Sequence, residues 1–258
     1  MRIAVCLKLV PATTADIRVA PGGQAPLLAG VEMAVSFYDE YALESALRLR
    51  AAFPGSTIHA LSVGGGECVK CLRHALALGV DSALHLQAQG ADARAAARLA
   101  AAALKPLAPD LVLCGRQAMD DDLCLFPGAL AEWLDWPHLS AVFSLDVATD
   151  QKAVKCRRRF EGGEQTLEAA WPVVISCDRG PHEPRIPTLK GRLAAKKMPL
   201  PERTPGDLGI AARDLGPALA PVRYAPPGQR TPKKVLAGAP AEAAAELLRL
   251  LRHEEKII

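Results

Sequence analysis

Short apolar runs alternate with longer segments of helical period over the first 137 residues. The runs are too short and too continuous for surface helices, so they predict buried strands. They cover residues 2–7, 57–63, 83–86 and 111–114. The helical segments between them cover residues 38–53, 67–78 and 92–104. Leu43, Ala46 and Leu47 share one face of the first, and Asp92 is the expected N-cap of the third. This alternation predicts a doubly wound, mostly parallel α/β sheet.

The pattern changes after Trp136-Pro137 to short β-type runs with no helical segment between them. Turn residues such as Gly162-Gly163 separate the runs, which is typical of strands joined by tight connections. The runs cover residues 141–148, 153–160, 165–170 and 173–177. We therefore expect an antiparallel extension that completes the sheet.

Prolines are concentrated in the last third of the chain. Residues 181–240 hold 12 of the 21 prolines, which predicts little regular structure there. A short helix is expected over 240–252, with Pro240 at its start and an apolar stripe along one face. The division predicted is an α/β nucleotide-binding-like domain over 1–180 and an extended, partner-docking arm with a C-terminal helix over 181–258. Apolar residues favour wrapping of the arm around a partner, and folding back over its own domain is the alternative. These residues are Ile186, Leu189, Leu193, Leu208 and Val235.

Amino-acid composition argues against several classes of protein. The 258 residues carry a formal net charge of +3 and only 4% aromatic residues, which argues against a nucleic-acid-binding surface. No apolar stretch has the length of a membrane span, and the apolar run at the N-terminus is too short for a signal peptide. Seven cysteines, an odd number, predict reduced thiols rather than a disulfide framework. A cytoplasmic protein without a membrane span is expected.

Two motifs are weak candidates for chemistry. Gly64-Gly65-Gly66 follows a predicted strand and precedes a helix, a geometry that can hold an anion but that also serves as a plain tight turn. Cys68 and Cys71 form a CxxC at a helix start, where the helix dipole lowers a thiol pKa, yet no second CxxC completes a zinc site. The six histidines show no ligand spacing, so neither a metal site nor a catalytic constellation is predicted.

The end of the fourth strand carries the most informative polar run. It reads Gly115-Arg116-Gln117-Ala118-Met119 followed by Asp120, Asp121 and Asp122. In open α/β sheets ligands bind beyond the carboxyl ends of the strands. Three carboxylates at a strand end and helix start can also simply cap free N–H groups. A Mg²⁺ site is disfavoured, because adjacent residues on a helix point in different directions.

Several segments together resemble the β subunit of electron transfer flavoproteins. They comprise residues 38–44, 72–81, 115–122, 134–137, 161–164, 183–189 with Lys196-Lys197, and 205–209. The resemblance is collinear over about residues 1–210, and the combination is specific although each piece is short. It agrees with a long arm that reaches a partner.

The resemblance implies a non-catalytic electron carrier subunit that relays electrons from dehydrogenases to a quinone-linked or ferredoxin-linked acceptor. It implies an α subunit as partner in a heterodimer, with FAD mainly on, or shared with, that subunit. It also implies that the loop over 183–197 docks the electron-donating dehydrogenase. Leu189 matches the position of an apolar anchor there, and the basic residues beside it are Lys190, Arg192, Lys196 and Lys197.

The family's nucleotide pocket, which holds AMP or a second FAD, is implied at the strand ends. The expected cofactor-binding residues are Cys6, Tyr38, Asp39, Gly115, Arg116, Gln117, Ala118, Asp120, Asp121 and Asp122. The chain departs from the family pattern in two places, with Ser36-Phe37 before the Tyr-Asp pair and apolar Leu123 to Phe126 in place of a polar turn. We therefore hypothesise that nucleotide binding is weakened, altered or absent. Two alternatives remain open, a structural subunit of a larger redox complex without its own cofactor and an adenine-nucleotide-binding enzyme on the same scaffold.

Overall fold

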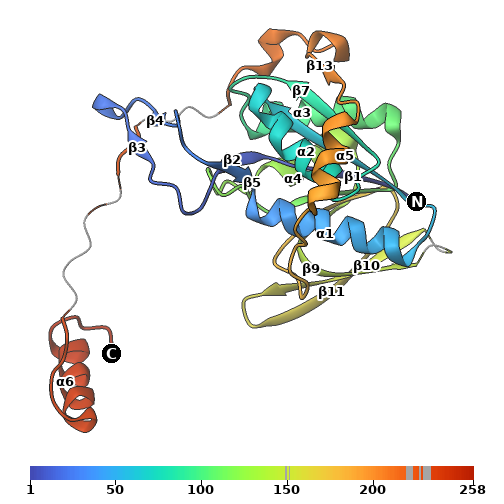
Figure 1. Cartoon of the computed structure of the whole chain (residues 1–258). Helices are drawn as coiled ribbons and strands as arrows, with labels where there is room; N and C mark the ends of the chain where they lie inside the picture. Colours follow the sequence, from blue (N-terminus) through green and yellow to red (C-terminus); the bar gives the residue numbers. More distant parts are fainter. Residues whose placement is uncertain (149, 151, 219–222, 227, 229–233) are drawn as a thin grey trace.

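One twisted sheet organises the chain (Figure 1). The computed structural model describes residues 1–148, 150, 152–218, 223–226, 228 and 234–258, and within these residues nine strands form the sheet in the order β11-β10-β9-β12-β8-β1-β6-β7-β13. Its parallel centre consists of β1 (Arg2–Cys6), β6 (Thr57–Gly64), β7 (Ser82–Gln87) and β8 (Leu111–Gly115). All five residues of β8 are buried, as expected for a strand covered on both faces. The four predicted strands are confirmed.

Helices cover both faces of this centre, which confirms the doubly wound α/β fold. On one face lie α1 (Phe37–Ala52), α2 (Val69–Ala77) with the 3₁₀ turn η2 (Gly66–Cys68) before it, and α5 (Leu189–Lys197). On the other lie α3 (Ala93–Leu104), continued by η3 (Lys105–Leu107), and α4 (Phe126–Leu134). The Asp92 carboxylate accepts a hydrogen bond from Ala95 N at 2.8 Å, so the predicted N-cap of α3 is confirmed.

The extension of the sheet differs from the prediction in one strand. β9 (His138–Ala148), β10 (Ala153–Phe160) and β11 (Gly163–Ala170) are antiparallel neighbours, as expected. β12 (Val173–Cys177) instead inserts between β8 and β9 and runs parallel to both, so its antiparallel assignment was wrong. All five of its residues are buried, which suits an interior position between two strands.

The segment from 183 to 215 contains regular elements that the proline count did not predict. They are α5, β13 (Glu202–Arg203), and the 3₁₀ turns η4 (Gly206–Leu208) and η5 (Ala212–Leu215). β13 pairs in parallel with β7 at the sheet edge, and α5 packs on α2. The expectation of little regular structure was therefore wrong for this segment, because its prolines stand between the elements rather than inside them. This segment packs on the domain that precedes it, and the boundary near 180 stays a prediction.

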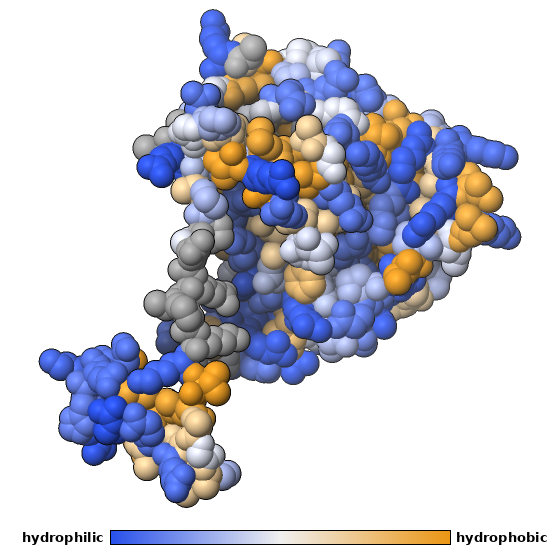
Figure 2. Space-filling model, turned by 60° about the vertical axis from the view of Figure 1, so that its left-hand side comes forward, coloured by the Kyte–Doolittle hydropathy of each residue, from blue (hydrophilic) through white to orange (hydrophobic). Residues whose placement is uncertain are grey.

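Two outlying parts extend from the sheet. A strand pair formed by β2 (Leu9–Pro11) and β5 (Met33–Val35) leads to a second pair, β3 (Arg18–Val19) and β4 (Pro26–Leu27), joined by η1 (Pro21–Gly23). The predicted C-terminal helix is confirmed as α6 (Pro240–His253), which lies apart from the sheet in Figure 1. Figure 2 shows apolar surface on this separate helical body. Among the described residues, no helix is long and apolar enough to cross a membrane.

Candidate functional site

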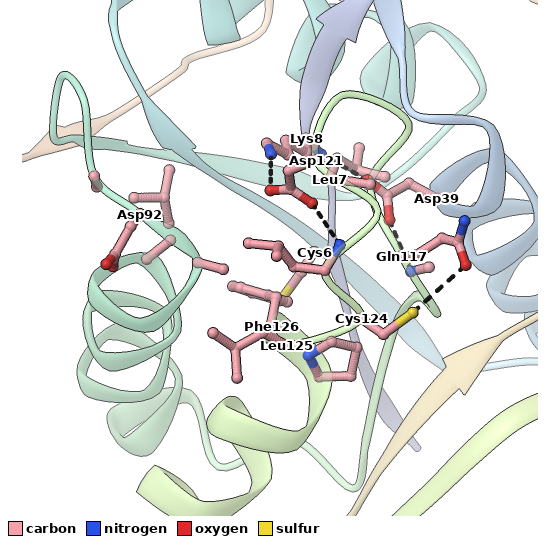
Figure 3. Close-up of a pocket in the computed structure, with 18 of the residues that line it drawn as sticks. Cys6, Leu7, Lys8, Asp39, Asp92, Gln117, Asp121, Cys124, Leu125 and Phe126 are labelled. Carbon is pink, nitrogen blue, oxygen red and sulfur yellow. Dashed lines mark hydrogen bonds and ion pairs between the residues drawn. The ribbon is translucent and has the colours of Figure 1, made fainter. Parts of the chain in front are cut away.

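A pocket of about 380 Å³ opens at the carboxyl ends of β1, β6 and β8 (Figure 3). The chain leaves β1 toward α1 on one face and reaches β8 from α3 on the other, so the strand order reverses between these two strands. Such a switch point is where open α/β sheets bind ligands. Of the predicted cofactor-binding residues, those that line the pocket are Cys6, Asp39, Gly115, Gln117, Ala118 and Asp121. Tyr38, Arg116, Asp120 and Asp122 lie in the same region outside the lining.

Asp39 fastens the start of α1 to the ends of two strands. Its carboxylate accepts hydrogen bonds from Lys8 N and from Gly115 N, both at 2.7 Å. Burial raises the pKa of Asp39 to about 7, although these two bonds and the charge of Lys8 oppose the shift. Asp39 therefore holds the floor of the pocket together, and its acceptor oxygens are engaged by the protein itself.

Lys8 is a site residue that was not among those predicted. Its ammonium lies 2.7 Å from Asp120 Oδ1 and 2.9 Å from Asp121 Oδ2. Burial works against its charge, but the hydrogen bonds and attraction of the two carboxylates outweigh burial and raise the pKa of Lys8. The available signal was its place at the end of the first strand, directly beside the expected pocket.

The three successive carboxylates do not lie at a helix start, so that part of the prediction was wrong, but one of them does cap a free N–H group. α4 begins at Phe126, and no side chain caps it. Asp121 Oδ1 accepts from Leu123 N at 3.1 Å, and Asp122 Oδ1 accepts from Gln117 Nε2 at 2.8 Å. These carboxylates close the turn and neutralise Lys8. Across the described part of the chain, no His, Cys, Asp and Glu side chains are grouped so that they could hold a metal ion.

Tyr38 and Arg116 form a separate contact beside the pocket. The Arg116 guanidinium lies over the Tyr38 ring, 4.8 Å from its centroid, and donates to the Tyr38 hydroxyl at 3.2 Å. It also pairs with Asp178 at 3.4 Å. Both predicted residues are thus occupied with each other, and neither side chain lines the cavity.

The lining does not fit a phosphate group. The turn after the three carboxylates contributes Leu123, Cys124, Leu125, Phe126 and Pro127. Pro127 also removes an N–H from the first turn of α4, and the Asp92 carboxylate already caps α3, whose first residues border the pocket. Among the described lining residues Lys8 is the one cation, and two carboxylates already bind it. An entering phosphate would meet apolar groups and acidic side chains.

The CxxC and the glycine turn do not add to this site. Burial raises the pKa of Cys68, and it raises that of Cys71 to about 12, so the expected lowering by the helix terminus is reversed. A protonated thiol is a poor nucleophile, which argues against redox chemistry at this pair. The glycines at 64–66 are outside the lining, and a side chain at Gly65 would collide with Gln89.

The segment 183–197 presents an apolar surface with basic neighbours. Leu189 is 75% exposed at the first turn of α5, and Ile186 and Leu193 are exposed beside it. The predicted docking residues Lys190, Arg192, Lys196 and Lys197 are all exposed as well. Gly191 allows the close approach of α5 to α2, because a side chain there would collide with Ala77 O. The structure thus places Leu189, Leu193 and the four basic residues on α5, with Ile186 just before it.

An ion pair anchors this segment to α1. Arg185 Nε and Nη2 donate to the two carboxylate oxygens of Glu44 at 2.7 and 2.9 Å, and Glu44 is buried. Tyr41 adds a hydrogen bond from its hydroxyl to Glu183 at 2.8 Å. Burial opposes the charge of Glu44, but the bonds and charge of Arg185 prevail and lower the pKa of Glu44.

Replacement of Glu44 by Gln should produce a pH-dependent loss of stability. A carboxyl whose pKa is lowered on folding stabilises the protein above its unfolded pKa of about 4.3, and this contribution is lost as the pH falls through the lower folded value. We expect E44Q to lower the free energy of unfolding by about 2 kcal/mol at pH 7 and by progressively less below pH 5. Urea unfolding at pH 7, 5 and 4 measures the difference. Glu67→Gln, which removes an exposed carboxylate, is the control, and an E44Q deficit that stays constant with pH would contradict the assignment.

Comparison with known proteins decides the family. The profile of the electron transfer flavoprotein domain matches residues 28–208. The electron transfer flavoprotein subunit beta of Bacillus subtilis is 36% identical over 234 residues, which cover 89% of this chain and 90% of that protein. The subunit beta of Homo sapiens is 32% identical over 262 residues, covering 100% and 99%. The chain belongs to the electron transfer flavoprotein β-subunit family.

Family membership settles the class of function. The subunit beta of Bradyrhizobium diazoefficiens, 29% identical with full coverage of both chains, extends the same match. The chain is therefore an electron transfer protein of a flavoprotein family. An adenine-nucleotide-binding enzyme and a cofactor-free structural subunit, the two alternatives, are not favoured.

Proposed function

We propose that this chain is the non-catalytic half of a heterodimer whose α subunit carries the FAD, and that it relays electrons from a dehydrogenase to a quinone-linked or ferredoxin-linked acceptor. The exposed apolar face of α6 is the observation that supports pairing with a partner independently of the family match. Leu247 is 48% exposed and Leu248 51%, and Ile257 and Ile258 beyond the helix are also exposed. A surface of this kind calls for a partner. The free state of all seven cysteines supports a reducing compartment, the cytoplasm.

The dehydrogenase is proposed to dock on 183–197. Leu189 supplies an apolar anchor, and the exposed cations of α5 supply attraction for an acidic partner. The anchor stands on a helix that is fastened to α1 and α2, so little ordering is needed when the partner binds.

The nucleotide pocket is proposed to hold neither AMP nor a second FAD tightly. Hydrogen bonds to a charged phosphate are each worth about 1.5 to 3 kcal/mol, and none of the described lining residues is an uncommitted cation that could replace them. The chain would still frame a flavin on its partner, because this role does not depend on a phosphate site of its own.

Co-expression with the α subunit tests the proposal. We expect a 1:1 complex that contains one FAD and less than a tenth of an equivalent of AMP after denaturation and extraction. Leu247→Asp with Leu248→Asp should prevent co-purification, because two carboxylates would be buried at the contact. His253→Asp, at an exposed position on the other side of α6, is the matched control and should leave the complex intact.

Different outcomes reject different parts of this proposal. A colourless complex would overturn the flavin-framing role. Stoichiometric AMP, or two flavins per heterodimer, would overturn the loss of nucleotide binding while leaving the pairing in place. Co-purification that resists the double substitution would remove α6 from the interface.

A further inference from the structure

Among the described residues that line the pocket at β1, β6 and β8, the side chains of Lys8, Asp39, Asp92 and Gln117 are paired within the protein. Lys8 binds Asp120 and Asp121, and the Asp39 carboxylate accepts two backbone N–H groups. Gln117 donates to Asp122 and lies 3.5 Å from Cys124 Sγ. The Asp92 carboxylate accepts from two backbone N–H groups, Ala95 N and Ala218 N. A ligand that enters this cavity therefore meets charged and amide groups that already have partners in the protein, which favours ligands that require few hydrogen bonds.

The remaining lining is apolar and partly open to solvent. Leu61 and Val63 come from β6, and Leu123, Leu125 and Phe126 come from the turn before α4 and its first residue. Leu123 is 48% exposed and Leu125 38%, so the pocket leaves apolar surface uncovered that a ligand would bury. Figure 3 shows Leu125 and Phe126 beside Cys6 on one side of the cavity.

An aromatic side chain from the C-terminal arm completes the lining. Tyr224 reaches the pocket, and its backbone N donates to Gly23 O at 2.8 Å. A side chain at Gly23 would lie only 2.5 Å from Tyr224 O, so the two backbones are in close contact. Together with Phe126, Tyr224 provides a second ring against which a flat ring system can pack.

The charge of the lining disfavours anions. Lys8 is matched by two carboxylates, and Asp92 and Asp39 add further acidic groups at the same cavity. An anionic ligand would lose its hydration without gaining an unpaired cation.

We propose that this pocket binds a small, uncharged, largely apolar molecule that contains an aromatic ring. The inference rests on the proposed function in one respect, namely that the pocket no longer retains a nucleotide phosphate. It goes further by assigning a different ligand class to the same cavity. The cavity of about 380 Å³ is at the lower end of the size range of small-molecule sites and has room for a ligand of two fused rings.

Calorimetric titration of the full chain with two matched probes tests this inference. 2-Naphthol and 2-naphthoate share one fused ring system, and at pH 7 the first is neutral and the second is an anion. We expect 2-naphthol to bind at one site per chain and 2-naphthoate to bind at least tenfold more weakly. Absence of 2-naphthol binding, or equal or tighter binding of the anion, would overturn the proposal.

Paired substitutions locate the bound probe. Leu125→Asp adds a carboxylate to the lining and should weaken 2-naphthol binding at least tenfold, and Leu123→Asp provides a second test at a more exposed position. Leu107→Asp is the control, because Leu107 is 37% exposed, nearly as Leu125 is, but lines a separate apolar groove beside β6, β7 and α3. If L107D loses 2-naphthol binding while L125D and L123D retain it, the probe binds in the groove beside Leu107, and the proposed site is rejected.

The nucleotide content of the purified heterodimer tests the proposed loss of phosphate binding separately from the proposed ligand class. A complex that contains stoichiometric AMP contradicts the proposed loss of phosphate binding and the ligand class together. A complex free of nucleotide whose chain fails to bind 2-naphthol contradicts the ligand class alone.

Discussion

Gly115→Ala is expected to lower the free energy of unfolding by about 2 to 3 kcal/mol. A Cβ atom at this position would lie 2.5 Å from Asp39 Oδ1, 2.8 Å from Asp39 N and 2.8 Å from Tyr38 C. Two of these three atoms belong to the backbone of α1, so the collision cannot be relieved by rotating one side chain. The added methyl group would push α1 away from β8 and weaken the hydrogen bonds of Asp39 to Lys8 N and Gly115 N. Urea unfolding should show a lower midpoint with an unchanged slope.

Gly128→Ala is the matched control for this prediction. Gly128 lies in the first half of α4, and the nearest atom to an added Cβ is His138 Nδ1 at an ordinary 3.9 Å. Alanine has the higher helix propensity, so this variant should be neutral or gain up to about 1 kcal/mol. If G115A and G128A unfold at the same urea concentration, the close contact between α1 and β8 does not contribute to the free energy of unfolding as expected.

Leu189→Asp is expected to lower kcat/KM for reduction of the proposed heterodimer by its proposed dehydrogenase partner at least roughly 30-fold, the equivalent of losing an anchor worth about 2 kcal/mol. Leu189 is 75% exposed, so the substitution should leave the stability of the free chain within about 0.5 kcal/mol. Because Lys190, Arg192, Lys196 and Lys197 surround the anchor, added salt should raise KM in the unsubstituted protein. Stopped-flow reduction at two ionic strengths measures both effects.

Phe160→Asp serves as the control for the docking surface. Phe160 is 55% exposed at the end of β10, in the antiparallel extension of the sheet, whereas α5 packs on α2. Both substitutions replace an exposed apolar side chain by a carboxylate, so a general effect of added charge should appear in both. Equal losses in L189D and F160D, or no loss in L189D, would remove 183–197 from the docking surface.

The hydrophobic pattern predicted most of the sheet because burial on both faces leaves a local signal. β1 after Arg2 and β8 are continuous apolar runs, β6 has a buried centre with polar residues on either side, and α1 repeats its apolar residues at helical spacing. Strand direction leaves no such signal, which is why β12 was assigned to the wrong orientation. α5 was missed for a different reason. The proline content of the whole segment concealed a proline-free stretch that begins with a Thr188 cap.

Only the site residues that belong to a recognisable short motif could be predicted. The short motifs identified Asp39, Gly115 and the three carboxylates, and the structure brings them to one edge of the sheet. Lys8 was missed because its partners Asp120 and Asp121 lie more than a hundred residues away along the chain. The high pKa of Cys71 likewise depends on the elements that bury its thiol and not on its place in a helix.

The length of chain between η5 and α6 determines how far the C-terminal helix can reach from the sheet. Tyr224, whose backbone N contacts Gly23 O, divides this connection, and the fifteen residues between Tyr224 and Pro240 span at most about 55 Å when fully extended. In the proposed heterodimer, α6 therefore acts as a tethered second contact whose effective concentration is set by this connection. If the main contact surface opens briefly, the partner stays within reach and rebinds without a diffusional search. Dilution should then separate the subunits far more slowly than the strength of either contact alone would suggest.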